Sequence, residues 1–234
     1  GAGFIGSWLC KDLLKKGYRV VCVDNKITGS ESNISGINDR SFSFIGKDVS
    51  QPLDIKEPVD YIFHLASPAS PVHYQLHPVE TLMANSLGTL NLLKLAKEKG
   101  AKLLYASSSE VYGDPKEHPQ KESYWGNVNP NGPRACYDEG KRFSEALISS
   151  FPGARWTIIR IFNTYGPNMN KNDGRVVPNF VNQAIEGKPL TVYGQGKQTR
   201  SFCFVTDLVG GIEKAMFVSK TDSEVINLGN PNEI

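Results

Sequence analysis

The sequence predicts an α/β fold in which helices cover both faces of a parallel, doubly wound β-sheet. Short apolar runs rich in β-branched residues alternate with stretches of helical periodicity, which is the pattern of successive βαβ units. Glycines three residues apart stand at the start of the chain and lead directly into the first helical stretch. No internal repeat or low-complexity tract interrupts this alternation.

The first element is a glycine turn that leads into a helix. Gly3 and Gly6 stand three residues apart, and apolar residues follow at helical spacing from Leu9 onward. This spacing predicts a helix over Ile5–Lys16, which Gly17 ends. Free backbone N–H groups at such a helix start bind phosphate. The opening of the chain therefore indicates a nucleotide-binding turn.

The following elements are predicted from apolar residues at strand spacing and at helix spacing. Strands are predicted at Tyr18–Asp24, Phe42–Lys47, Tyr61–Ala66, Lys102–Ser108 and Trp156–Phe162, with helices at Pro78–Glu98 and Pro133–Ser150. After Phe162 the chain becomes rich in Gly, Pro and Asn. In this part we predict helices at Val176–Glu186 and Asp207–Val218, and strands at Leu190–Tyr193, Ser201–Val205 and Val225–Leu228.

This change of pattern predicts two domains. Residues 1–163 form a Rossmann-like domain, and residues 164–234 begin a smaller α/β substrate domain with segments that return to the first. In a nucleotide-binding βαβ unit a buried strand precedes the glycine turn. That strand and the first glycine of the motif would lie before position 1. We therefore expect a piece truncated at both ends that is inactive by itself.

The composition is that of an enzyme-sized globular chain. Hydrophobic residues make up 39% of the 234 residues, and the formal net charge is +2, too small by itself to indicate nucleic-acid binding. No apolar run approaches the roughly 18–20 residues of a membrane span. The four cysteines and four histidines lack metal-ligand spacing, so we predict buried thiols and no metal site.

Acidic and small residues follow the predicted strands where a dinucleotide would lie. Asp24 ends the strand after the glycine turn, where a carboxylate accepts hydrogen bonds from both ribose hydroxyls of NAD and repels a 2′-phosphate. Asp48 ends the next strand and is either an adenine ligand or a turn residue. Ala66 closes the following strand, where the nicotinamide half is expected.

Tyr137 and Lys141 form the most informative pair. Four residues apart on a helix, they share one face, so the ammonium can lower the phenol pKa from its usual value of about 10. A tyrosine with such a pKa can take a proton from a sugar hydroxyl. A Tyr-x-x-x-Lys spacing is common on solvated helix faces. It indicates a catalytic pair only where the chain also supplies a dinucleotide site.

Several motifs together resemble the extended short-chain dehydrogenases/reductases that act on nucleotide sugars. In chain order they are Gly3-Phe-Ile-Gly6, Asp24, His64-Leu-Ala-Ser67, Ser107-Ser-Ser-Glu-Val-Tyr-Gly113, Tyr137-x-x-x-Lys141 and Arg160-Ile-Phe-Asn-Thr-Tyr-Gly-Pro167. The resemblance extends from Gly1 to Ile234. It implies NAD as the cofactor, bound by Gly3, Phe4, Ile5, Gly6, Asp24, Asp48, Ala66 and Lys141.

Within this family the chain is most similar to the branch of UDP-glucuronic acid decarboxylases, which form UDP-xylose. The similarity lies in His64-Leu-Ala-Ser-Pro-Ala-Ser-Pro71, Gly132-Pro-Arg-Ala-Cys-Tyr-Asp-Glu-Gly-Lys-Arg142, Asn172-Asp-Gly-Arg-Val-Val177 and Leu190-Thr-Val-Tyr-Gly-x-Gly-x-Gln-Thr-Arg200. It implies oxidation at C4 of the glucuronyl ring, loss of CO₂ from the 4-keto sugar, and return of the hydride by the same cofactor.

The resemblance assigns roles to four residues. Tyr137 would be the base at the C4 hydroxyl, assisted by Lys141, and Ser108 would orient that hydroxyl. Glu110 would assist decarboxylation or the protonation of C5. Dehydratases carry an Asp where this chain has Ser109, and epimerases carry a small residue where it has Glu110. Both differences favour the decarboxylase branch.

The diphosphate of a UDP-sugar needs cations and hydrogen-bond donors. The segment from Arg134 to Phe202 contains ten Lys/Arg residues and five Asp/Glu residues. We expect Arg175 and Arg200 to bind the diphosphate, with Asn163 as a hydrogen-bonding partner and Tyr193 against the uracil. Any single arginine could instead be a surface charge of little effect.

Other functions and properties remain open. A nucleotide-sugar 4-epimerase or 4,6-dehydratase would share the oxidation step, and an inactive NAD-binding regulatory protein would share only the fold. The resemblance also implies a homodimer in which the two predicted helices Pro78–Glu98 and Pro133–Ser150 meet their counterparts. We expect a cytoplasmic protein, although relatives with an N-terminal Golgi anchor leave the Golgi lumen open.

Overall fold

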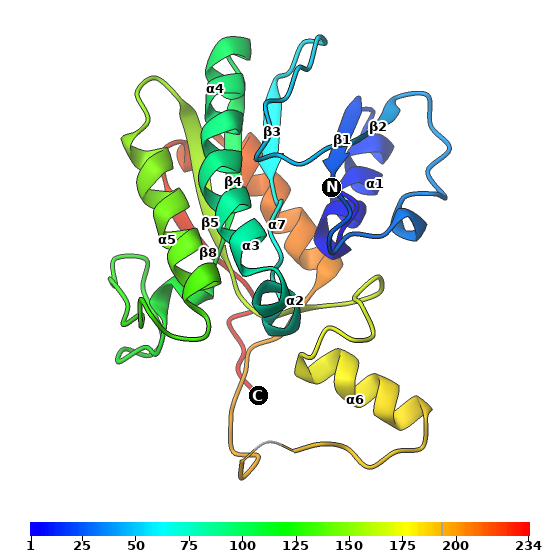
Figure 1. Ribbon diagram of the computed structural model, residues 1–234, viewed down its shortest axis with the longest axis vertical. Coiled ribbons are helices and arrows are strands. Elements are labelled where there is room, and N and C mark those ends of the chain that lie inside the picture. Colours follow the sequence, from blue (N-terminus) through cyan, green and yellow to red (C-terminus); the bar gives the residue numbers. More distant parts are fainter. Residues whose placement is uncertain (193) are drawn as a thin grey trace.

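Parallel strands form the centre of the fold in the computed structural model, which describes residues 1–192 and 194–234 (Figure 1). Four strands pair in the order β3 (Tyr61–His64), β4 (Lys102–Ser108), β5 (Arg155–Ile161) and β8 (Val225–Leu228). β1 (Val20–Asp24) and β2 (Phe42–Gly46) form a separate parallel pair. Among the described residues no ladder joins β1 to β3, so the predicted single sheet is divided into two parts.

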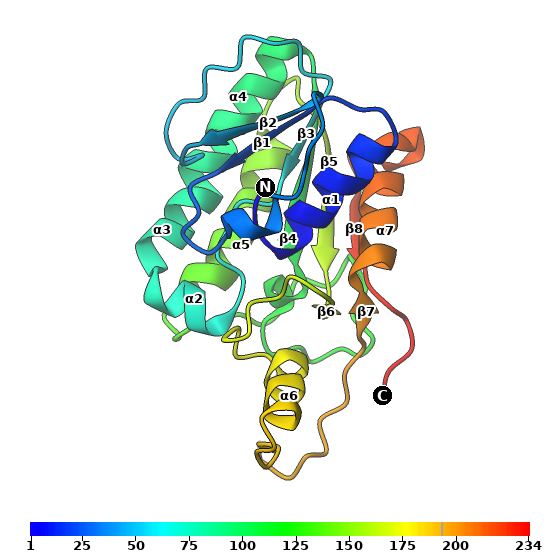
Figure 2. The same ribbon diagram turned by 90° about the vertical axis from the view of Figure 1, so that its right-hand side faces the viewer.

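Helices cover both faces of the sheet, as the doubly wound fold requires. One face carries α1 (Phe4–Lys15) and α7 (Val205–Phe217), and the other carries α4 (Thr89–Lys99) and α5 (Ala135–Ser150) (Figure 2). A short helix α2 (Pro71–Leu76), absent from the sequence prediction, precedes α3 (Pro78–Met83). A π-helical turn, Ala84–Gly88, joins α3 to α4, so the predicted helix Pro78–Glu98 is continuous but irregular.

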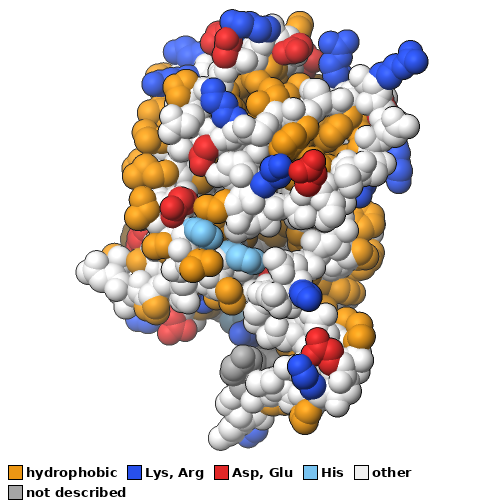
Figure 3. Space-filling model, turned by 45° about the vertical axis from the view of Figure 1, so that its right-hand side comes forward, with side chains coloured by type: hydrophobic (Ala, Val, Ile, Leu, Met, Phe, Trp, Pro, Cys, Tyr) orange, Lys and Arg blue, Asp and Glu red, His pale blue; other side chains and the backbone are white. Residues whose placement is uncertain are grey.

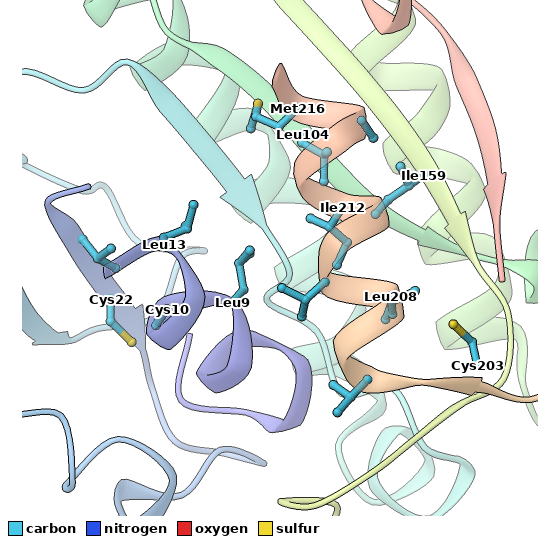
Figure 4. Close-up of a cluster of buried hydrophobic side chains, with 14 residues drawn as sticks. Leu9, Cys10, Leu13, Cys22, Leu104, Ile159, Cys203, Leu208, Ile212 and Met216 are labelled. Atoms are coloured by element: carbon cyan, nitrogen blue, oxygen red, sulfur yellow. The ribbon is translucent and has the colours of Figure 1, made fainter. Parts of the chain in front are cut away.

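The core follows from the alternation of side chains along β4. Leu104 points to the α1 and α7 side and packs with Leu9, Leu208 and Ile212 (Figure 4). Leu103 and Tyr105 point to the other side and pack with α4 and α5. Every residue of β4 is buried, because successive strand residues face opposite sides and both sides are covered.

A buried lysine marks the start of β4. The Lys102 Nζ donates to the backbone oxygen of Met216 at 2.8 Å and pairs with the Asp222 carboxylate at 2.6 Å. These contacts place a positive charge at the C-terminus of α7, where the helix dipole favours it. The carboxylate and the carbonyl oxygen together compensate the desolvation cost of burying this charge.

The last part of the chain is smaller and more irregular. It contains the two-residue strands β6 (Thr164–Tyr165) and β7 (Cys203–Phe204), which pair with each other, and α6 (Val176–Ile185). α7 packs against the core that α1 and β4 share, and β8 pairs with β5. Residues 190–192 are not in a strand, so the prediction of a strand at Leu190–Tyr193 is wrong for them, and Tyr193 lies outside the described residues.

Charges are mixed on the surface. On the face in Figure 3, Lys and Arg side chains are interspersed with Asp and Glu, and no large patch of one sign is visible. Within the described ranges, no helix combines the length and apolar character that a membrane crossing requires. The same ranges hold no cluster of three or more His, Cys, Asp or Glu side chains that could bind a metal ion.

Candidate active site

One cavity of about 630 Å³ collects nearly all of the predicted site residues. It lies where the start of α1 meets the carboxyl ends of the parallel strands, the usual place for ligands in such sheets. Its lining includes Gly3, Phe4, Ile5, Gly6, Asp24, Asp48, Ala66, Ser108, Glu110, Tyr137, Lys141, Asn163, Arg175 and Arg200. Tyr193 falls outside the described residues, so its expected role stays a prediction.

The glycine turn presents backbone donors to this cavity. Gly3 is the N-cap of α1, and no side chain caps the N-terminus of this helix. A Cβ at Gly3 would have no protein atom within 4 Å, whereas a Cβ at Gly6 would lie 2.5 Å from the Gly1 carbonyl oxygen. The two glycines therefore have different tasks: Gly6 permits close backbone packing, and Gly3 leaves space in front of the helix start.

Asp24 supports the glycine turn from the end of β1. Its Oδ2 accepts hydrogen bonds from the backbone nitrogens of Gly1 and Ala2, both at 2.8 Å, and its Oδ1 accepts one from Lys26 at 2.7 Å. Burial raises the pKa of this carboxyl, but the Gly1 ammonium and these hydrogen bonds outweigh burial and keep the pKa below its usual value. A carboxylate has about four acceptor sites, so capacity remains for a ribose.

Asp48 has both of the features that the sequence left open. Its Oδ1 accepts a hydrogen bond from the Ser50 nitrogen at 2.7 Å, which makes it a turn residue. Its Oδ2 accepts one from Asn25 Nδ2 at 2.7 Å, and the residue also lines the cavity. Its position therefore permits a contact with a ligand beside Asp24.

Tyr137 is buried in the first turns of α5. Its ring stacks on Tyr74, with centroids 4.9 Å apart and an interplanar angle of 8°. A hydrogen bond from Ser108, the last residue of β4, reaches Tyr137 from the sheet side. Two elements therefore position the phenol. Tyr74 of α2 orients its ring, and Ser108 at the end of β4 orients its hydroxyl group.

Lys141 lies one helical turn beyond Tyr137 and is also buried. Its Nζ donates to the Ala106 carbonyl oxygen at 2.8 Å and lies 5.6 Å from the centroid of the Tyr137 ring. Burial lowers the pKa of this ammonium to about 7, against the opposing charge of Glu145. The lysine is thus poised between its charged and neutral forms near neutral pH.

The expectation that the pKa of Tyr137 is lowered is wrong for this structure. Burial raises the pKa of the phenol, and this effect outweighs the hydrogen bond from Ser108 and the positive charge of Arg175, which both lower it. The Lys141 ammonium is directed to a backbone carbonyl rather than to the phenol oxygen. Further positive charge must therefore enter the cavity before Tyr137 becomes an effective base.

Glu110 lies beside this pair and has a partner that the sequence analysis missed. It belongs to the 3-10 turn Ser109–Tyr112, whose start is fixed by a hydrogen bond from the Glu110 nitrogen to Ser108 Oγ at 3.2 Å. Its carboxylate forms an ion pair with Arg134, the N-cap residue of α5. The Arg134–Asp138 spacing of four residues was the only signal in the sequence for this charged group.

The candidate substrate residues lie on the other wall of the cavity. Arg175 pairs with the buried Asp173 and contributes a positive charge at Tyr137. Asn163 follows β5, and Arg200 is exposed at the rim, where its Nη1 donates to the Thr199 carbonyl oxygen at 2.7 Å. The structure therefore brings Arg175 close to Tyr137 and leaves Arg200 at the entrance.

Asn85, which the sequence analysis did not single out, is a buried residue behind the cavity wall and contacts Ser67, which lines the cavity. It stands in the π-helical turn, and its Nδ2 donates to Ser67 Oγ at 2.9 Å. Its Oδ1 accepts a hydrogen bond from Tyr105 at 2.7 Å. π-Helical turns often occur at functional sites, but no side-chain pattern distinguishes this one in the sequence.

The comparisons with known proteins decide the family. Residues 1–229 match the model of the NAD dependent epimerase/dehydratase family. The chain belongs to this epimerase/dehydratase family. Over its whole length it is 53% identical to UDP-glucuronic acid decarboxylase 1 of Xenopus tropicalis and covers 55% of that protein. The chain thus spans about half the length of such curated relatives.

Solved structures of the epimerase/dehydratase family confirm the fold. An epimerase of Methanothermobacter thermautotrophicus matches the whole chain with a TM-score of 0.88 and 30% identity, and 70% of that chain is covered. A dTDP-glucose 4,6-dehydratase of Streptomyces venezuelae, solved with NAD bound, matches the whole chain with a TM-score of 0.84 and 25% identity, and 75% of that chain is covered. The predicted α/β class and family are therefore confirmed.

The residues of the cavity fit the dinucleotide that the family name implies. The uncapped N-terminus of α1 supplies donors for a pyrophosphate, and the space in front of Gly3 lets that group approach the backbone. Asp24 supplies acceptors for ribose hydroxyls and a negative charge against a 2′-phosphate. The donor and acceptor set is that of an NAD site.

The two glycines give a test of this fit. We expect Gly3→Ala to fold normally and to lose NAD affinity, because its new methyl group enters only the space in front of α1. Gly6→Ala should lose stability by about 1–3 kcal/mol, because its methyl group meets backbone. Thermal unfolding and NAD titration by calorimetry measure both effects. Equal NAD affinity of Gly3→Ala and the wild type would contradict the assignment.

Proposed function

We propose that this chain carries the NAD-binding and catalytic residues of a UDP-glucuronate decarboxylase, a carboxy-lyase that forms UDP-xylose. The observation that carries the proposal is the position of Glu110, whose carboxylate lines the same cavity as Ser108, Tyr137 and Lys141. Oxidation at C4 needs a base and a cofactor, whereas a carboxylate beside them serves a second step. The 53% identity to a UDP-glucuronic acid decarboxylase supports the same conclusion.

The side chains divide the work of the oxidation step. Tyr137 takes the proton of the C4 hydroxyl, which Ser108 orients. When bound, NAD⁺ supplies the hydride acceptor at C4 and a positive charge that favours the Tyr137 phenolate. Lys141, whose Nζ donates to the Ala106 carbonyl oxygen, has a pKa of about 7 and can exchange a proton with the site. Arg175 adds positive charge from the substrate side.

The 4-keto group makes the loss of CO₂ possible. A carbonyl at C4 lies β to the C6 carboxylate and accepts the electron pair of the C5–C6 bond as an enolate. Glu110 then serves the protonation of C5, and Tyr137 returns its proton to the C4 oxygen when the ketone is reduced. Ser109, which stands where dehydratases carry an Asp, offers no acid for expelling a C6 hydroxyl.

Product analysis with UDP-glucuronate and NAD⁺ tests the proposal. The protein encoded by the complete reading frame should release CO₂ and UDP-xylose in equal amounts, without net formation of NADH. UDP-glucose is the matched control, because it lacks the carboxylate and should give no product. UDP-galacturonate as the sole product would instead establish a 4-epimerase, and NAD binding without turnover would establish a regulatory protein.

We also propose a homodimer that uses the outer faces of α3 and α5. Large apolar side chains are exposed there: Val79, Leu82, Leu87 and Phe143. Leu93, in the predicted helix Pro78–Glu98, is fully buried, so only part of this helix is available to a partner. Such exposed apolar surface is typical of an interaction site.

The dimer proposal predicts the effect of one surface change. Phe143→Glu places a charge in the proposed contact and should shift the protein from dimer to monomer. Sedimentation velocity over a range of concentrations measures the shift. Leu190→Glu, on an exposed side chain away from α3 and α5, is the control and should leave the assembly unchanged. A monomeric wild-type protein would contradict the proposal.

A further inference from the structure

Arg134 stands between two cavities, and packing does not hold its side chain. It lines the main cavity of about 630 Å³ and a second one of about 500 Å³, formed mainly by residues 113–114 and 127–133. The side chain is 44% exposed. A long, rotamer-rich side chain in such a position loses conformational entropy when it is fixed. The position of the Arg134 side chain must therefore be set by ion pairs.

Two carboxylates supply that charge from different elements. The Nη2 of Arg134 forms an ion pair with Glu110 on the 3-10 turn, and its Nε lies 3.5 Å from Asp138 Oδ2 on α5. Asp138 is buried, and its Oδ1 has no hydrogen-bond partner among the described residues. A buried carboxylate with an unpaired oxygen lowers the stability of the fold. This cost indicates that Asp138 has a functional role.

Glu110 depends on this arrangement for its direction. Its side chain is 35% exposed, and among the described residues its carboxylate forms an ion pair only with Arg134. The Ser108 hydrogen bond fixes the Glu110 backbone and leaves the carboxyl group free to turn. Without the guanidinium, the carboxylate would favour water. The ion pair therefore decides whether Glu110 stays beside the reacting sugar.

We propose that Arg134 is a positioning residue for the decarboxylation half of the reaction, holding Glu110 beside C5 of the sugar while Asp138 anchors the guanidinium. This inference rests on the proposed function. In that half, the C5–C6 bond breaks, its electron pair forms the C4–C5 enolate, and CO₂ leaves. The enolate then takes one proton at C5, which reaches it from solvent by way of Glu110.

This role separates Arg134 from Tyr137 and Lys141. Oxidation at C4 needs the phenol and the cofactor but not Glu110. Loss of Arg134 should therefore leave the first step and slow the second. The backbone oxygen of Arg134 accepts hydrogen bonds from the nitrogens of Tyr137 and Asp138 at 2.9 and 3.0 Å. A side-chain change at Arg134 keeps these bonds, so the start of α5 should stay intact.

Single-turnover kinetics with UDP-glucuronate tests the inference in the complete protein. Until C5 is protonated, the enolate can recombine with CO₂ in the cavity, so a misplaced Glu110 slows net CO₂ release. For Arg134→Met we expect this release to slow roughly 10- to 100-fold, the size expected for a misplaced catalytic group. NADH, followed by its absorbance, should form at the wild-type rate and then accumulate. Arg134→Lys should recover part of the CO₂ rate, and Asp138→Asn should show the same defect in a weaker form.

Two further variants make the result specific. Arg155→Met is the matched control: Arg155 lies at the start of β5, is 64% exposed and pairs with Asp222, but does not line the cavity. It should leave the rates of NADH formation and CO₂ release unchanged. The Arg134→Met/Glu110→Gln double variant should be no slower than Glu110→Gln alone, because both changes remove the same function.

The outcomes separate this inference from the proposed function. A wild-type protein that releases no CO₂ from UDP-glucuronate disproves the proposed function itself. If the wild type releases CO₂, three results would overturn the inference alone. They are an equal slowing of NADH formation and CO₂ release in Arg134→Met, an increase in KM with unchanged kcat, and additive defects of Arg134→Met and Glu110→Gln.

Discussion

Tyr137→Phe will bind NAD with nearly unchanged affinity and turn over UDP-glucuronate about 10²- to 10⁴-fold more slowly, the range expected for loss of a general base. The change removes only the hydroxyl that Ser108 reaches and keeps the ring that stacks on Tyr74. Fold and cavity shape should therefore be preserved. Steady-state kinetics and NAD titration of the complete protein measure the two effects separately.

Tyr74→Phe is the matched control for this prediction. The two rings stack at 4.9 Å, so either change removes one hydroxyl from the same aromatic pair. The Tyr74 hydroxyl is buried without a hydrogen-bond partner among the described residues. Removing an unpaired buried hydroxyl should cost no stability and retain most of the activity. Wild-type turnover by Tyr137→Phe would refute the assignment of the base.

Lys141→Met is expected to lose activity and to gain stability at neutral pH. Burial lowers the pKa of Lys141 from 10.5 to about 7 in the folded protein. Between these two values the unfolded chain binds more protons, so the stability of the wild type rises with pH across this window. Below pH of about 7 the wild type bears the full cost of burying the charge. Methionine removes that cost.

The pH dependence of unfolding distinguishes this effect from a general change in packing. We expect the Lys141→Met variant to unfold at a higher temperature than the wild type at pH 6–7, and the difference to shrink toward pH 10. Lys94→Met, on the exposed side of α4, should show no such trend. A constant difference at every pH would contradict the lowered pKa, and unchanged turnover would contradict the catalytic role.

Much of the site could be predicted because parallel strands end at a common edge. The strands Lys102–Ser108 and Val225–Leu228 have the predicted bounds, and the ends of β1, β4 and β5 meet at one cavity. Local signals therefore sufficed for Gly3, Asp24 and Tyr137. The strand predicted from Leu190 is absent over residues 190–192, because strand propensity produces a strand only where a partner strand lies alongside.

The electrostatics could not be predicted in the same way. The raised pKa of Tyr137 results from burial by α2 and β4, and no spacing along α5 reports that burial. The Glu110–Arg134 ion pair joins a strand end to a helix start far along the chain. Both depend on tertiary packing. Strand order predicts that these residues line one cavity, whereas their ion pairs and pKa shifts depend on packing that the spacing of residues does not show.

Helix α5 has two working sides, and this arrangement has a mechanical consequence. Tyr137 and Lys141 face the buried interior, whereas Phe143 stands on the exposed side, and a helix transmits displacement along its length as a stiff rod. The surface that the proposed dimer covers and the two proton-carrying groups of the cavity therefore belong to one rigid element. Association of two chains and proton transfer in the cavity thus depend on the position of the same helix.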